Sequence, residues 1–106
     1  MPKVQLLIAF LLLVSGVTHI TQLWFYELNK ITIGAALFGI VYFIIGALLL
    51  IGFRIAVLLS AVIPLIGALG GMYRYLKIER LKLIIFHLMI DIIVITLSFY
   101  LVLLRY

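Results

Sequence analysis

The sequence predicts an all-α membrane protein, a bundle of four transmembrane helices joined by short loops. Of the 106 residues, 69% are hydrophobic and only 10% are charged, and the mean hydropathy is +1.50. A chain of this size cannot hide so many apolar side chains in a core of its own, so the bilayer must solvate most of them. The apolar residues form four continuous segments, each of about 20 residues, the length that spans a hydrocarbon core of about 30 Å. Because the segments do not alternate between apolar and polar residues, a β-barrel is not expected, whereas helices satisfy the backbone in lipid.

The four segments belong to one transmembrane domain that covers residues 1–106. Helices are expected at about residues 4–25, 31–51, 53–73 and 83–104. Residues 26–30 form the first break, and Gly52 marks a tight turn in the second. The third break, residues 74–82, is the only strongly polar run. It fits a solvated basic loop or a helix extension, with a specific anion site as the less favoured alternative.

The distribution of basic residues predicts an orientation in the cell membrane. Four crossings place both termini on one side, where three basic residues lie: Lys3, Arg54 and Arg105. Five lie on the other side: Lys30, Arg74, Lys77, Arg80 and Lys82. The positive-inside rule then places the first and third loops in the cytoplasm and both termini outside, although a modest bias leaves a dual topology open. The net charge of +5 is typical of residues near anionic headgroups and does not indicate nucleic-acid binding.

Small residues in the second and third segments predict close helix packing. Gly39 and Gly46 are seven residues apart and share one face of the second segment. Gly67 and Gly71 form a GxxxG pattern in the third, and Pro64 is expected to kink that helix. Small residues at these spacings let helix backbones approach closely in lipid. We expect them to serve packing within the bundle, with a homo-oligomer interface as the alternative.

Polar residues within the first and fourth segments predict a buried site. His19 and Gln22 belong to a polar stripe on the first segment, and His87 and Asp91 lie one helical turn apart in the fourth. The helix rise places both histidines roughly 6–9 Å below the membrane surface on the side of the first and third loops. Asp91 lies one turn deeper. We therefore expect these four residues to meet in the interior of the bundle.

The carboxyl group of Asp91 is the most costly polar group in the chain. A lone carboxylate near the bilayer centre costs about 2.5–3.5 kcal/mol, so Asp91 is expected to face the interior. There it is hydrogen-bonded, paired with a histidine, or protonated because burial disfavours its charge. The four-residue spacing lets His87 donate to Asp91, which leaves the other ring nitrogen for a ligand or a proton.

Three interpretations of this polar cluster stay open. In the first, the cluster only fixes the first helix against the fourth. In the second, it is a proton or cation site in which Asp91 titrates. In the third, His19 and His87 hold a metal ion or a haem b, since haem iron takes two histidines that face each other at equal depth.

No catalytic constellation is visible in the sequence, so an enzyme is not the expectation. The chain has no cysteine, which excludes disulfides, thiolate metal sites and iron–sulfur clusters within it. It also shows no Ser-His-Asp arrangement, no phosphate-binding loop and no pair of carboxylates. Apart from the haem alternative, no cofactor is expected.

Two stretches resemble the DoxX-like four-helix membrane proteins. Residues 16–19 read Gly-Val-Thr-His, and residues 46–56 read GALLLIGFRIA. That family shows a small-residue turn with a polar residue at the end of its first helix. It also shows a glycine-bounded leucine run and a basic residue between its second and third helices. The resemblance implies a membrane subunit associated with respiratory or redox partners.

Three functional hypotheses follow from these observations, and we give them in order of preference. The first is a non-catalytic accessory or structural subunit that packs against larger membrane partners or against itself. The second is a proton-coupled transporter or channel for a small solute, which uses Asp91 with His87 and His19. The third is a membrane protein that binds haem b or a metal ion through His19 and His87.

Overall fold

The four predicted helices form an antiparallel bundle. The computed structural model describes residues 3–78 and 80–105. Over this part of the chain it contains four helices and no strand: α1 (Lys3–Phe25), α2 (Lys30–Leu50), α3 (Arg54–Lys77) and α4 (Lys82–Arg105). All four are long and apolar enough to cross a membrane, and the molecule measures 41 Å along its longest axis. The predicted all-α transmembrane bundle is confirmed, and the chain is a small multi-pass integral membrane protein.

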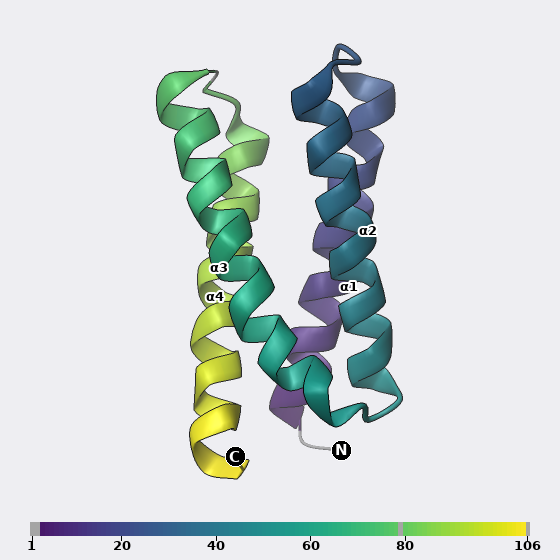
Figure 1. Ribbon diagram of the computed structural model, residues 1–106, viewed down its shortest axis with the longest axis vertical. Helices are drawn as coiled ribbons and strands as arrows, with labels where there is room; N and C mark the ends of the chain where they lie inside the picture. The colour runs from purple at the N-terminus through teal and green to yellow at the C-terminus, as the bar shows by residue number, and fades with distance from the viewer. Residues whose placement is uncertain (1–2, 79, 106) are drawn as a thin grey trace.

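The two ends of the bundle differ in which connections they carry. Both chain termini and the α2–α3 connection lie at one end, which we call the termini end (Figure 1). The α1–α2 and α3–α4 connections lie at the opposite end, which we call the loop end. Gly52 makes the α2–α3 turn with a φ of 81°, a left-handed conformation that glycine adopts without steric cost.

The observed helix ends lie close to those predicted from the sequence, except at the end of α3. Asn29 caps α2, because its side chain accepts hydrogen bonds from the backbone N–H groups of Ile31 and Thr32. The sequence predicts that the third helix ends at about residue 73, but α3 continues to Lys77. Residues 74–77 read Arg-Tyr-Leu-Lys and contain no glycine or proline, so nothing local stops the helix. This extra turn carries Arg74 into the bundle.

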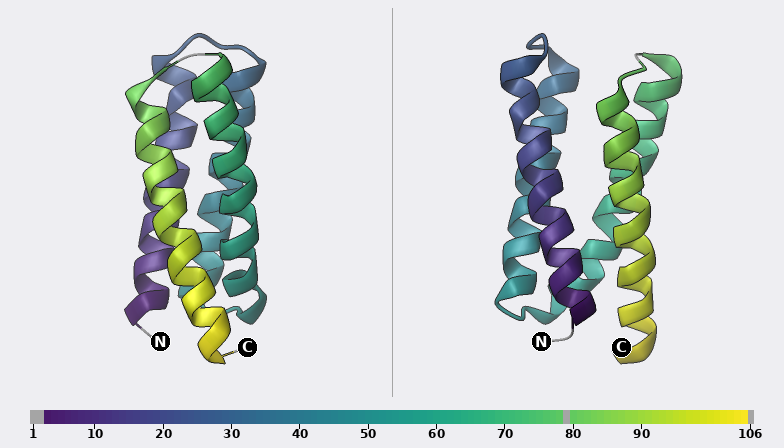
Figure 2. Two further views of the ribbon diagram at one scale, coloured as in Figure 1. Left: turned by 90° about the vertical axis from the view of Figure 1, so that its left-hand side faces the viewer. Right: turned by 180° about the vertical axis from the view of Figure 1, so that it is seen from behind.

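The bundle consists of two helical hairpins. α1 packs most extensively along α2, and α3 packs most extensively along α4, whereas contacts between the two pairs are fewer. Seen from two further directions, the pairs converge at the termini end and diverge at the loop end (Figure 2). The hydrophobic core lies toward the termini end. It includes a fully enclosed set from all four helices: Ile8, Leu12, Leu49, Ala56 and Val94.

Small residues bring α1 and α2 into backbone contact. A Cβ atom built on Gly39 lies only 2.6 Å from the Cβ of His19 and 2.7 Å from the carbonyl oxygen of Gly16. A Cβ atom on Gly46 lies 3.0 Å from the Cγ of Leu13. Any larger side chain at Gly39 must therefore push the two helices apart.

The remaining predicted packing residues all lie in α3. A Cβ atom on Gly67 overlaps the hydroxyl group of Tyr42, and one on Gly71 lies 3.3 Å from the Cδ2 of Leu88. Pro64 lies inside α3 and is buried. Because Gly67 and Gly71 face neighbours within the chain, their small size serves contacts inside the bundle. The kink expected at Pro64 stays a prediction.

Candidate functional site

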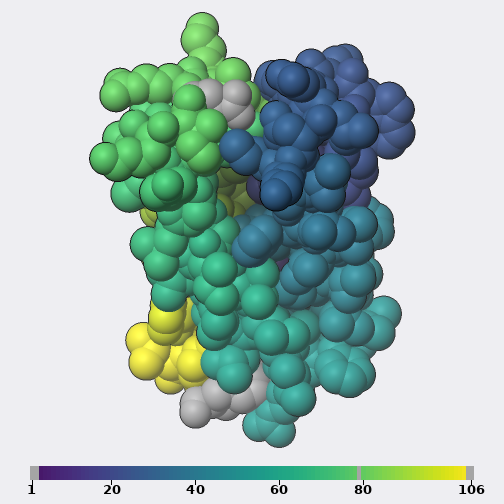
Figure 3. Space-filling model, turned by 45° about the horizontal axis from the view of Figure 1, so that its top comes forward, coloured from purple at the N-terminus to yellow at the C-terminus, as the bar shows by residue number. Residues whose placement is uncertain are grey.

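A cavity separates the two hairpins toward the loop end. Its volume is about 230 Å³, it is partly open, and all four helices contribute to its wall. The space-filling view, which brings the loop end forward, shows the furrow between the hairpins there (Figure 3). The polar side chains that line the cavity are His19, Gln22, Arg74, His87 and Asp91. The four polar residues predicted from the sequence therefore line one space, together with an arginine.

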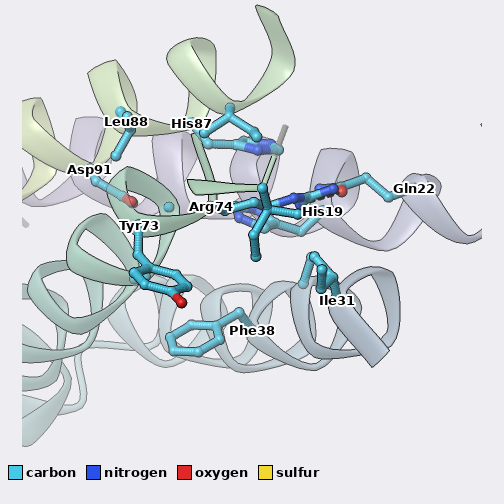
Figure 4. Close-up of a pocket in the computed structure, with 15 residues that line it drawn as sticks. His19, Gln22, Ile31, Phe38, Tyr73, Arg74, His87, Leu88 and Asp91 are labelled. Carbon is cyan, nitrogen blue, oxygen red and sulfur yellow. Dashed lines mark hydrogen bonds between the residues drawn. The ribbon is translucent and has the colours of Figure 1, made fainter. Parts of the chain in front are cut away.

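The two histidines stack directly on each other. The ring centroids of His19 and His87 are 3.7 Å apart, and the ring planes differ by 19°. Because α1 and α4 are antiparallel and the residues are equally deep, the rings meet across the interface. Both are labelled in the close-up of the cavity (Figure 4).

Each histidine makes a hydrogen bond to α1 through one ring nitrogen, and for His19 this bond determines which nitrogen carries a proton. His19 Nδ1 is 2.7 Å from the carbonyl oxygen of Ser15, which can only accept, so Nδ1 donates. His87 Nε2 lies 2.7 Å from Thr18 Oγ1, and either atom can donate; the Thr18 hydroxyl group can also donate to the backbone of Val14 or Ser15. With Nδ1 protonated, the neutral ring of His19 keeps Nε2 as an acceptor.

Asp91 is bonded to α2 and not to its own helix. The hydroxyl group of Tyr42 donates to Asp91 Oδ1 over 2.9 Å. The hydrogen bond from His87 to Asp91, which the four-residue spacing permits, does not form among the described residues, and His87 Nε2 lies near Thr18 instead. Of the open alternatives for Asp91, the hydrogen-bonded one is found, and the residue faces the interior as expected, where only 3% of its surface is exposed.

The second oxygen of Asp91 lies beside Gly67, and both residues line the cavity. A Cβ atom built on Gly67 lies 3.6 Å from Asp91 Oδ2 and overlaps the Tyr42 hydroxyl. Gly67 therefore leaves the space in which Tyr42 reaches Asp91. Within the described part of the chain, every fully enclosed side-chain nitrogen or oxygen has a hydrogen-bond partner. One oxygen of the carboxyl group is thus bonded to Tyr42, and the other lies beside Gly67, which also lines the cavity.

Gln22 and Arg74 form a second polar contact across the cavity. Arg74 Nη1 donates to Gln22 Oε1 over 3.0 Å, and the contact is buried. The sequence predicts that Gln22 joins the histidines and Asp91, but its partner is this arginine from α3. Figure 4 shows the Arg74 side chain reaching from α3 toward His19 and Gln22.

Sequence reasoning missed Arg74 and Tyr42. Arg74 stands in a basic run at a helix end, where a solvated side chain is the ordinary expectation. Tyr42 stands in an apolar segment, where tyrosine is one more large residue. The signal that indicates Arg74 is the lack of a helix breaker before residue 78. For Tyr42 it is the phenol group itself, which needs a hydrogen-bond partner when it is buried deep in lipid.

The stacked histidines do not suit a haem or a single metal ion in this arrangement. The rings are in van der Waals contact, so nothing fits between them. Lone pairs on parallel rings point along parallel planes and do not converge on one ion, as axial haem ligands must. Among the described residues, no group of three His, Cys, Asp or Glu side chains is placed to hold a metal ion.

Comparison with protein-family models, with curated proteins and with solved structures found no match.

Proposed function

We propose that the protein is a transporter that binds a small solute between its two hairpins and moves it together with a proton held on Asp91. The observation that carries this proposal is the position of Asp91. One of its oxygens is bonded to Tyr42, and its side chain lines a partly open cavity of about 230 Å³. A purely structural carboxyl group has no need of a cavity beside it.

The energetic cost of Asp91 supports a function that uses its charge. An ionised carboxylate near the bilayer centre costs about 2.5–3.5 kcal/mol. A neutral asparagine at this position could make a hydrogen bond to Tyr42 equally well. A carboxyl group adds the ability to alternate between a neutral and a charged form, which is how intramembrane acids act in proton-coupled transport.

The stacked histidines lie on the path that a proton takes from the loop end. His87 precedes Asp91 by one helical turn on α4 and is nearer to that end of the bundle. Each neutral imidazole ring has one nitrogen that can accept a proton. The pair is therefore suited to pass protons between the membrane surface and Asp91.

The division into hairpins supplies the motion that transport needs. Contacts within each hairpin exceed those between hairpins, so the hairpins can move as rigid units. In the present conformation they converge at the termini end and diverge at the loop end (Figure 2). Pivoting about the cavity reverses this, as in transporters that rock one bundle against another around a fixed site.

In our proposal, the distribution of basic residues decides to which side of the membrane the cavity opens. Five basic residues lie at the loop end and three at the termini end. In our proposal the protein lies in the cell membrane with the first and third loops in the cytoplasm, so that the cavity opens to the cytoplasm. A dual topology reverses this for half of the molecules.

Proton flux into liposomes tests the proposed function. The purified protein is reconstituted with an enclosed pH-sensitive dye, a pH gradient is imposed, and small anionic, cationic and neutral solutes are added one at a time. At least one solute accelerates the dye response in the parent protein, and Asp91→Asn abolishes that response while the helical circular-dichroism spectrum is unchanged. The matched control is Thr96→Val, a change to an exposed hydroxyl group on the same helix. If no solute accelerates proton entry in the parent protein, the proposal fails.

Assembly with larger partners is a second and compatible proposal. It rests on the DoxX-like resemblance of residues 16–19 and 46–56, which implies respiratory or redox partners. Self-association rested on small-residue faces, but Gly39, Gly46 and Gly67 contact neighbours within the chain. These glycines therefore supply no argument for an interface between copies.

A further inference from the structure

We infer that the ligand of the cavity is a single-chain amphiphile with an anionic headgroup, which enters sideways from the membrane between α2 and α3. Its hydrocarbon chain lies in the cavity, and its headgroup stays at the loop end beside Lys30 and Lys77. This inference rests on the proposed function, because it concerns the same cavity, and it names the class of solute that the protein binds.

The cavity is closed toward α1 and α4 and open toward the lipid between α2 and α3. On the closed side, the wall residues Gln22 of α1 and His87 of α4 are only 1% and 6% exposed. On the open side, the wall residues Tyr73 and Ile78 of α3 are 63% and 49% exposed. Figure 3 shows this opening as the furrow between α2, in blue, and α3, in green. Because the outer faces of membrane-spanning helices meet lipid, a molecule dissolved in the membrane can reach the cavity from the side.

Gly70 marks space in the furrow that no protein atom fills. The residue lines the cavity, and a Cβ atom built on it meets nothing within 4 Å. By contrast, a Cβ atom on Gly67 overlaps the hydroxyl group of Tyr42, and one on Gly71 lies 3.3 Å from the Cδ2 of Leu88. At Gly70, therefore, the room that a side chain would take is left for a ligand and not for a neighbouring helix.

The length and volume of the furrow suit one hydrocarbon chain. Its wall runs from Ile31 to Phe38 on α2 and from Gly67 to Ile78 on α3, which the helix rise converts to roughly 10 Å and roughly 16 Å. Half of the hydrocarbon core of a bilayer is about 15 Å, the depth that a lipid chain covers in one leaflet. An apolar cavity of about 150 Å³ holds a benzene molecule, so a volume of about 230 Å³ holds a segment of one chain and not of two.

The polar groups in the wall do not oppose an apolar chain, because they are bonded within the protein. Gln22 accepts a hydrogen bond from Arg74, and Asp91 accepts one from Tyr42. Within the described part of the chain, every fully enclosed side-chain nitrogen or oxygen has a partner. Burial of a polar group is costly when it lacks a hydrogen bond. Most of the cavity surface is apolar, so the ligand need not supply hydrogen bonds there.

Lysine residues at the mouth of the furrow favour an anionic headgroup. Lys30 and Lys77 are exposed, and each adjoins a residue of the cavity wall, Ile31 and Ile78 respectively. Lys82 begins α4 at the same end of the bundle and is also exposed. By sequence, the loop end carries five basic residues and two acidic residues. Basic residues near the membrane surface attract anionic headgroups, so a negatively charged amphiphile is favoured over a zwitterionic one.

Native mass spectrometry of the full chain in maltoside micelles tests the class of ligand. The probes are lysophosphatidylglycerol, lysophosphatidylcholine and glycerophosphoglycerol. The first two share one chain and differ in charge, and the third is the first headgroup without its chain. One lysophosphatidylglycerol is expected to bind per protein, about tenfold more tightly than lysophosphatidylcholine, and glycerophosphoglycerol is expected not to bind.

Three results of this titration overturn the inference. Equal affinity for the two lysolipids contradicts the anionic headgroup. Binding of glycerophosphoglycerol as tight as that of lysophosphatidylglycerol contradicts the need for a chain and indicates a free oxyanion. If lysophosphatidylglycerol does not bind at all, the inference fails, whereas the proposed function is still decided by proton flux with the other solutes.

A side chain placed in the furrow tests where the hydrocarbon chain lies. Gly70→Leu is expected to weaken lysophosphatidylglycerol binding at least about tenfold, because the leucine fills space that the chain requires. The matched control is Gly34→Leu on α2, since a Cβ atom there also meets nothing within 4 Å and Gly34 does not line the cavity. Leucine favours a helix more than glycine does, so both variants are expected to keep the helical circular-dichroism spectrum. Equal affinities in the two variants overturn the position of the chain.

Two lysine variants test where the headgroup lies. Lys30→Gln and Lys77→Gln are each expected to lower the affinity for lysophosphatidylglycerol about threefold to fivefold and to leave that for lysophosphatidylcholine unchanged. Lys3→Gln is the matched control, because Lys3 is exposed and begins α1 at the termini end. An equal loss in Lys3→Gln, or no loss in either loop-end variant, contradicts the position of the headgroup.

A phospholipid of the bilayer offers the same headgroup on two chains, and competition separates the two sources. The titration with lysophosphatidylglycerol is repeated in micelles that contain an excess of phosphatidylglycerol. Undiminished binding of the lysolipid supports a ligand with one chain, which is what the cavity can hold. Displacement by phosphatidylglycerol overturns the single-chain assignment.

Discussion

The two interfaces that α1 forms, one with α2 and one with α4, differ in how closely the helices pack. At the interface with α2, Gly16 and Gly39 have no side chains, so the backbones of α1 and α2 come into contact. Toward α4, His19 stacks on His87, and polar side chains border a cavity of about 230 Å³. The same helix is thus closed on one side and holds open space on the other.

This difference separates positions that hold the fold from positions that are available for function. In lipid there is no hydrophobic drive between helices, so close packing and hydrogen bonds hold them together. The α1–α2 interface uses close packing. The interface between hairpins uses hydrogen bonds placed around a space, which holds the hairpins together without filling it.

The largest expected effect lies at the closed interface. Gly39→Val places two methyl groups where even a Cβ atom lies 2.7 Å from the Gly16 carbonyl oxygen, and overpacking with backbone displacement costs about 2–4 kcal/mol. Unfolding in mixed micelles, followed by circular dichroism, measures the loss. The matched control is Gly34→Val on the same helix, because no atom lies within 4 Å of a Cβ atom there, and its expected effect is within about 0.5 kcal/mol. Equal losses in the two variants show that the α1–α2 contact is not tight.

A smaller effect is expected at the cavity, from Tyr42→Phe. The change removes the donor to Asp91 Oδ1 and keeps the ring, so the expected loss of unfolding free energy is about 1 kcal/mol. A double-mutant cycle with Asp91→Ala tests whether the two side chains act as a pair, with an expected coupling of about 1 kcal/mol. Tyr100→Phe, at an exposed position on α4, is the control. Additive losses from Tyr42→Phe and Asp91→Ala contradict the hydrogen bond.

The smallest effect is expected inside the second hairpin, from Ser98→Ala. Ser98 pairs with Ser60 over 2.8 Å, and Ser60 still donates to the Val57 carbonyl oxygen when Ser98 is removed. No enclosed donor is left unsatisfied, and the expected loss is about 0.6 kcal/mol, the average for hydrogen bonds between transmembrane helices. A loss as large as that of Tyr42→Phe contradicts this account, because it shows that the Val57 carbonyl oxygen does not satisfy Ser60 by itself.

The fold could be predicted from the sequence because length and hydropathy decide it. A continuous apolar segment in lipid has one way to satisfy its backbone, and turn residues such as Gly52 show where each segment ends. The shared depth of His19 and His87 also follows from the helix rise and the direction of each crossing. These are properties of single helices, which the sequence describes well.

The details of the site depend on properties that a single helix does not determine. His87 bonds Thr18 and Asp91 bonds Tyr42 because of how α1, α2 and α4 are rotated about their axes. The inward direction of Arg74 depends on one additional turn of α3. The hydropathy of a segment does not change when its helix rotates about its axis, and it changes little when the helix gains one turn. The partners of polar side chains could therefore not be predicted from hydropathy.

The tight turn at Gly52 also bears on how the protein is made. It joins two hairpins that each form most of their contacts internally. Because folding units form N-terminal first during synthesis, α1 and α2 can close their glycine contact before α3 and α4 pack beside them. The second hairpin then inserts beside a finished partner, and the cavity forms last, where two completed units meet.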